Sequence, residues 1–71
     1  MSEFELYQAE KQKLDGFVAQ KFKIVGVLED LEGAWLDLEH PEGEKAKLHL
    51  TTANARKYYV NVLLSQGKTK D

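Results

Sequence analysis

Cysteine is absent from this sequence, proline occurs once and histidine twice. Without cysteine there is no disulfide framework and no thiolate metal site, so a domain below about 80 residues must be stabilised by packing or by association. No apolar stretch approaches the ~20 residues that a membrane-spanning helix needs, and the acidic start Met-Ser-Glu-Phe-Glu-Leu is unlike a secretory signal. We therefore expect a soluble, cytoplasmic protein with no membrane association.

The chain also lacks the spacings of the common catalytic and metal sites. There is no phosphate-binding glycine loop, no HExxH motif and no Ser-His-Asp order, and the acidic residues do not follow the twelve-residue pattern of a calcium loop. His40 is interpreted as a turn residue and His49 as a cross-strand neighbour, with weak metal or proton chemistry as the alternative. We expect no cofactor, no bound metal and no enzymatic activity.

What is present predicts one folded α+β domain over residues 1–71. The chain is 42% hydrophobic and 31% charged, which is typical of globular proteins, and its length allows a single core. The expected order is α-β-β-β-α, with a three-stranded antiparallel meander packed against two helices.

The first segment has the periodicity of an amphipathic helix. Its apolar residues recur near every 3.6 positions: Phe4, Tyr7, Leu14, Phe17 and Val18. Polar residues fill the other side: Glu10, Lys11, Lys13 and Gln20. Ser2 and Glu5 have the spacing of a capping box, and Gly16 leaves the end of the helix open between residues 15 and 20.

Three strands are predicted at residues 22–28, 34–39 and 45–50. Gly26 inside the first strand suggests a bulge or a close-packing point, and residues 30–33 form a turn. A five-residue loop at 40–44 places Glu39 opposite Lys45, Asp37 opposite Lys47, Leu36 opposite Leu48 and Trp35 opposite His49. Apolar residues then meet on one face and opposite charges on the other, which supports this register.

Residues 52–66 are compatible with either a helix or a strand. The length of the segment and its Thr-Thr-Ala start favour a helix, while Tyr58-Tyr59-Val60-Asn61-Val62 has strand propensity. Residues 66–71 are expected to form a frayed tail, because Gly67 is a typical helix stop.

Strand alternation directs Trp35 away from the core-facing leucines, to the same side as Val25, Val27 and His49. An aromatic residue surrounded by polar ones is typical of a protein interface, so these four residues are a candidate partner-binding patch. The alternative is that the second helix or the tail covers them.

Basic residues offer a second candidate surface. The helix–three strands–helix order resembles the double-stranded-RNA-binding domain, which implies RNA contacts from the helices, here Lys11, Lys13, Arg56 and Lys57. This sequence departs from that family in two places. An uncharged turn replaces the lysine cluster that opens the second helix, and the acidic His40-Pro41-Glu42-Gly43 replaces a glycine-proline-histidine loop. If residues 52–66 were a strand, a small Sm-like or SH3-like barrel would be the alternative fold.

The formal net charge of −2 argues against a general nucleic-acid binder. We therefore interpret the chain as a small regulatory or adaptor protein, bacterial or phage in style. It is expected to recognise a protein partner or a second copy of itself through the open sheet face around Trp35. RNA binding is the second hypothesis and catalysis the third.

Overall fold

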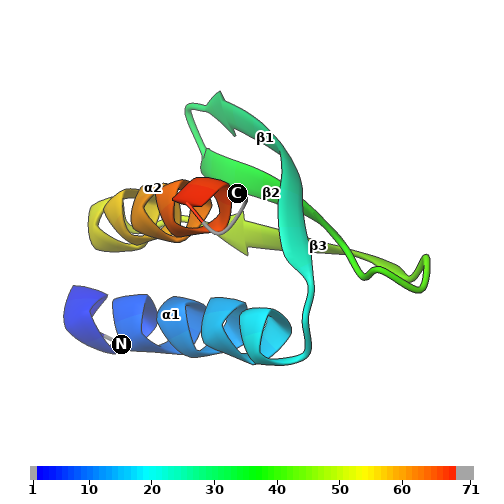
Figure 1. Ribbon diagram of the computed structural model, residues 1–71. Coiled ribbons are helices and arrows are strands. Elements are labelled where there is room, and N and C mark those ends of the chain that lie inside the picture. The colour runs from blue at the N-terminus through cyan, green and yellow to red at the C-terminus, as the bar shows by residue number, and fades with distance from the viewer. Residues whose placement is uncertain (1, 69–71) are drawn as a thin grey trace.

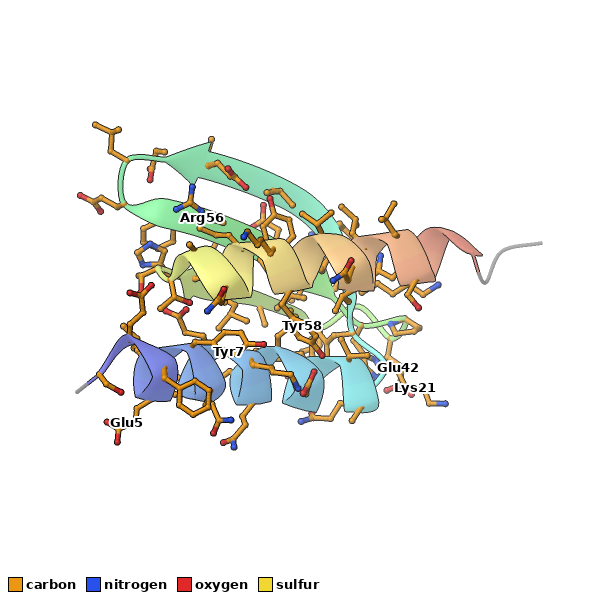
Figure 2. The ribbon with its side chains drawn as sticks, turned by 90° about the vertical axis from the view of Figure 1, so that its left-hand side faces the viewer. Glu5, Tyr7, Lys21, Glu42, Arg56 and Tyr58 are labelled. Atoms are coloured by element: carbon orange, nitrogen blue, oxygen red, sulfur yellow. The ribbon has the colours of Figure 1, made fainter. Side chains whose placement is uncertain are left out.

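A computed structural model describes residues 2–68 (Figure 1). The elements follow the predicted order, namely α1 (Glu3–Ala19), β1 (Lys23–Asp30), β2 (Gly33–Glu39), β3 (Lys45–Leu50) and α2 (Ala53–Lys68). The strands form one antiparallel sheet in the order β1-β2-β3. Both helices lie on the same face of this sheet, side by side and pointing in the same direction (Figures 1 and 2). The α+β prediction is confirmed, and the ambiguous C-terminal segment is a helix.

Helix α1 begins with the predicted capping box. The Ser2 side chain accepts a hydrogen bond from the Glu5 backbone N–H at 3.2 Å, and the Glu5 carboxylate accepts one from the Ser2 N–H at 3.3 Å. The helix continues through Gly16 to Ala19. Lys21 then adopts a left-handed conformation (φ 78°), which turns the chain into β1.

The β2–β3 hairpin has the predicted register at every pair. Leu36 lies opposite Leu48, and the charged pairs fall on the other face. Leu36 is fully buried and Leu48 nearly so. The loop is closed by the His40 N–H, which donates to the Glu44 carbonyl at 2.8 Å. The register predicted from a five-residue loop and from cross-strand pairing is therefore confirmed.

A bulge in β1 corrects the expected orientation of Val27. Ile24 lies opposite Leu38, but the next pair is Gly26 with Asp37, so one extra residue enters β1. Val27 then lies opposite Leu36, on the helix-covered face, and Leu28 lies opposite Trp35. The prediction that Val27 shares a face with Trp35 was wrong, because a bulge inverts the alternation of all residues after it.

The core fills the space between the helices and one face of the sheet. Its buried residues come from all five elements and the α1–β1 turn: Leu14, Phe22, Ile24, Ala34, Leu36, Leu38, Leu48, Leu50, Ala55 and Tyr59. Tyr59 and Ala55 are one turn apart on α2, which explains why this face of the helix packs on the sheet.

Helix α2 extends beyond the expected stop at Gly67 and ends at Lys68. Its last turns are attached to the edge of the sheet by Gln66. The Gln66 amide accepts a hydrogen bond from the Ile24 N–H at 2.8 Å and donates one to the Ile24 carbonyl at 3.2 Å. This contact explains why residues 66–68 belong to the helix; residues 69–71 of the expected frayed tail lie outside the described residues.

Candidate binding surface on the open sheet face

The face of the sheet opposite the helices is called the Trp35 face below. Strand register assigns these residues to it: Lys23, Leu28, Asp30, Trp35, Asp37, Glu39, Lys45, Lys47 and His49. Val25, the unpaired residue of the bulge, lines a hollow on this face with Asp37 and Glu39. Val25, Trp35 and His49 therefore lie where the sequence predicted them. Val25 is 60% exposed.

One row of side chains crosses all three strands of this face. Leu28 on β1 lies opposite Trp35 on β2, and Trp35 lies opposite His49 on β3. The Trp35 and His49 rings are stacked, with centroids 3.6 Å apart and planes 4° from parallel. Stacking leaves Trp35 half-buried, whereas Leu28 is 64% exposed. The row is an aromatic platform with an aliphatic side chain at its β1 end.

The β1–β2 turn beside this row is held by two hydrogen bonds. The Asp30 carboxylate accepts a bond from the Glu32 N–H at 2.9 Å. The Glu32 carbonyl lies 2.8 Å from Nε2 of His49, which donates when that nitrogen carries the proton. Leu31, at the tip of the turn, is fully exposed. His49 thus supports Trp35 on one side and the turn that presents Leu31 on the other.

Leu28 and Leu31 were missed as site residues. The available signal for Leu28 was Gly26, since a glycine inside a strand suggests a bulge, and a bulge moves Leu28 onto the Trp35 face. Leu31 stands in a turn of acidic residues, where an apolar side chain has no core to enter.

The charges on the Trp35 face balance. Three lysines (Lys23, Lys45 and Lys47) stand against three carboxylates (Asp30, Asp37 and Glu39). Asp37 and Lys47 form an exposed ion pair at 3.6 Å. These two residues, with Leu28, Asp30 and Trp35, line an open hollow of about 310 Å³. The surface is therefore mixed in character and has no net charge to attract a polyanion.

Of the four basic residues considered for RNA binding, Lys11, Lys13 and Arg56 lie on different parts of the surface. Lys11 lies between the helices, where it pairs with Asp15 at 2.9 Å and sits 4.9 Å from the centre of the Tyr58 ring. Lys13 lines a hollow beside β3. Arg56 points from α2 toward the β1–β2 hairpin, on the side of the helix away from Tyr58 (Figure 2). Lys57 is exposed next to it in the chain.

The start of α2 is occupied by a buried carboxylate that the sequence analysis had placed on the solvent side of α1. Glu10 accepts four hydrogen bonds, from the backbone N–H and the hydroxyl of both Thr51 and Thr52, at 2.7 to 3.2 Å. Burial raises the pKa of Glu10, but these bonds outweigh burial and hold the pKa below its ordinary value. Thr52 also caps α2 by accepting from the Ala55 N–H at 3.1 Å. Glu10 therefore fills the position where a helix N-terminus would otherwise bind an external anion.

His40 makes only local contacts, within its own loop and with Phe22. Nδ1 of His40 accepts a hydrogen bond from the Glu42 N–H at 3.0 Å, and its ring packs edge-on against Phe22. Between residues 2 and 68, no three His, Asp or Glu side chains are grouped so that they could hold a metal ion. Neither helix in that range has the length and apolar character to cross a membrane.

Comparison with protein-family models, with curated proteins and with solved structures finds no match to this chain. The likeness to the double-stranded-RNA-binding domain therefore rests on the order of the elements alone, and fold order by itself does not imply function.

Proposed function

We propose that this chain is a small cytoplasmic binding module, without catalytic activity, that recognises a protein partner through the Trp35 face. The observation that carries the proposal is the row Leu28–Trp35–His49, which places an aromatic platform and exposed aliphatic groups on a sheet face opposite both helices. Tryptophan surrounded by polar residues is a common anchor of protein interfaces.

The attachment of the β1–β2 turn favours binding. Glu32 is bonded through both its N–H and its carbonyl, so Leu31 is presented from a backbone that is already ordered. A surface that is ordered before association loses less conformational entropy when a partner binds. Leu31, Leu28 and Trp35 would contribute the apolar centre, and the Asp37–Lys47 pair part of the polar rim.

The chemistry of this face suits a protein better than a nucleic acid. Phosphate binding requires clustered positive charge, whereas this face carries equal numbers of lysines and carboxylates. Lys11, Lys13 and Arg56 lie on different parts of the surface, and Glu10 occupies the N-terminus of α2. A partner with interspersed charges and an apolar anchor is therefore the better fit.

The proposal is tested by affinity capture with immobilised full-length protein, comparing wild type with Leu31→Ser and Trp35→Ala. We expect at least one protein to be retained by wild type and reduced about tenfold or more by each variant, the effect of losing an interface anchor. Phe4→Ser is the matched control, because Phe4 is similarly apolar and exposed but lies on α1. The retained protein is then purified and its affinity measured by calorimetry.

Two results would contradict this function. One is capture that Leu31→Ser and Trp35→Ala leave unchanged, which would locate the binding surface elsewhere. The other is micromolar binding of duplex RNA at physiological salt that falls steeply with added salt and is weakened by Lys57→Glu, which would favour the RNA hypothesis.

A further inference from the structure

The free edge of β3 presents backbone hydrogen-bonding groups, because β3 is an edge strand of the sheet. Directly after β3, the Thr51 N–H points away from β2, since it donates to the Glu10 carboxylate on α1 at 2.8 Å. Backbone groups alternate in direction along an antiparallel strand, so those of Lys45, Lys47 and His49 also point away from β2. The bond that closes the hairpin loop has the same phase. Within residues 2–68, no side chain bonds the outward groups of these three residues, and a free edge of this kind accepts a further strand.

A groove lies along this edge. α1 is the helix beside β3 (Figure 1), and an open hollow of about 520 Å³ separates the second half of α1 from the middle of the strand. Phe17 and Leu48 give the hollow an apolar lining, and Lys13 and Lys47 give it positive charge. The hollow is therefore placed where a fourth strand would run beside β3.

Gly16 on α1 keeps this groove open. It lies inside the helix with a backbone that is not left-handed, where alanine is more stable than glycine. A Cβ built at Gly16 would meet no atom of the chain within 4 Å. Neither backbone conformation nor packing within the described chain requires glycine here, so what the missing side chain provides is clearance in the groove.

The lining shows which side chains an added strand should carry. Neighbouring strands share their faces, so alternate residues of an added strand would lie beside Lys47, and the others beside Leu48 and Phe17. No carboxylate lines the groove. Lys47 pairs with Asp37 on its β2 side, and Lys13 makes no ion pair within residues 2–68. A strand that alternates acidic and aliphatic residues is therefore complementary to this groove in both charge and polarity.

We propose that the groove between β3 and α1 binds an extended acidic segment of a partner protein, which adds to β3 as a fourth strand. Its acidic side chains lie beside Lys13 and Lys47, and its aliphatic ones contact Phe17 and Leu48. Strand addition takes affinity from main-chain bonds and specificity from alternate side chains. A second copy of β3 is the poorer occupant, because its own lysines would lie beside Lys47. The proposal does not rest on the apolar centre of the Trp35 face.

The groove is tested by an NMR titration of the full chain with the blocked peptide Glu-Val-Glu-Val-Glu-Val-Glu. Saturable shifts are expected at the amides of β3, with hydrogen exchange of the Lys47 and His49 amides slowed about tenfold or more, because the peptide bonds the free edge. The Leu48 amide faces β2 and is the internal reference. The peptide Lys-Val-Lys-Val-Lys-Val-Lys should bind about tenfold more weakly or worse.

Two variants test the lining. Lys13→Glu should weaken binding of the acidic peptide about tenfold, and Lys57→Glu, an exposed charge reversal on α2, is the matched control that should not. Gly16→Gln should be at least as stable as wild type in thermal melts, because glycine is unfavourable inside a helix. The same variant should weaken peptide binding about tenfold or more, because the new side chain occupies the groove.

Several results would overturn this assignment. They are an acidic peptide that shifts no β3 amide, bound peptide that leaves the Lys47 and His49 amides unprotected, and Gly16→Gln protein that binds like wild type. A wild-type dimer that Gly16→Gln converts to monomer would also overturn it, by placing a second copy in the groove. Leu31→Ser should leave peptide binding unchanged, so failure of this groove and failure of the Trp35 face are distinguishable.

Discussion

Glu10 ties α1 to the start of α2, because its carboxylate binds four donors there. Glu10→Gln keeps one oxygen acceptor and introduces an amide NH2, so some of the buried donors lose their partner. We expect this variant to lower the free energy of unfolding by about 2–3 kcal/mol. Urea denaturation measures the change, with the exposed Glu3→Gln as the control. Equal stability of the two variants would contradict the assigned role of Glu10.

Trp35 and Leu36 are adjacent in the chain but lie on opposite faces of the sheet. Leu36 is fully buried, so Leu36→Ala should cost about 2–5 kcal/mol and can unfold a domain of this size. Trp35→Ala removes the stack on His49 but opens no hole in the core, so its cost should be smaller. Thermal and urea melts rank the two variants. A more stable Leu36→Ala protein would show that Trp35 is the core residue.

At the level of elements, the β2–β3 hairpin provides a test of register through Asp37 and Lys47. Exchanging both charges preserves the opposite-charge pair, so the double variant should differ from wild type by less than about 0.5 kcal/mol. Asp37→Lys alone places two lysines opposite each other and should destabilise slightly. Urea midpoints distinguish the cases, and a double variant less stable than the single one would contradict the pairing.

The same hairpin shows how much of the fold the sequence could predict. Its register followed from local rules, because closing a five-residue loop at 40–44 sets charges opposite charges and Leu36 opposite Leu48. The α2 helix, in contrast, was ambiguous, since residues 58–62 have strand propensity and the choice depends on the packing of Ala55 and Tyr59 on the sheet.

The sequence predicted the candidate site only in part, because the bulge in β1 changes which side chains face outward. Trp35 and His49 lie on β2 and β3, away from the bulge, and they were placed correctly. Val25 is the extra residue of the bulge itself, and it still lies beside Asp37 and Glu39 on the Trp35 face. Val27 was placed on the wrong face, because the extra residue near Gly26 changes the alternation after it. The role of Glu10 could not be predicted, since its partners Thr51 and Thr52 are about forty positions away in the sequence.

For the whole molecule, stability should depend on pH at both extremes. The bonds described above lower the pKa of Glu10 from 4.5, and the Tyr58 hydroxyl, aided by Lys11, lowers the pKa of Asp15 from 3.8. A carboxyl whose pKa is lower in the folded state stabilises the fold above its unfolded pKa. This contribution is lost as the pH falls below about 4.5 through the folded values.

At alkaline pH, stability is lost as the pH rises, because the pKa values of two tyrosines are higher in the folded state. Burial and the bond to Glu29 raise the pKa of Tyr59 to about 12 from 10.0, and the bond to Asp15 raises that of Tyr58. A raised pKa favours the protonated folded form, so this stability is present below pH 10 and is lost as the pH rises toward 12. Urea midpoints at pH 2.5, 7 and 11 should therefore be highest at pH 7. A midpoint that is as high at pH 2.5 would contradict the account of Glu10 and Asp15.

Binding through the Trp35 face is the central claim, and the single tryptophan of the sequence reports on it directly. The measurement is the fluorescence of Trp35 during titration with the partner retained in the capture experiment, with acrylamide quenching at each point. Binding over this face should shift the emission and reduce quenching, with saturation at the stoichiometry found by calorimetry. Measured binding heat with unchanged Trp35 emission and quenching would contradict the claim, because the partner would then be bound elsewhere.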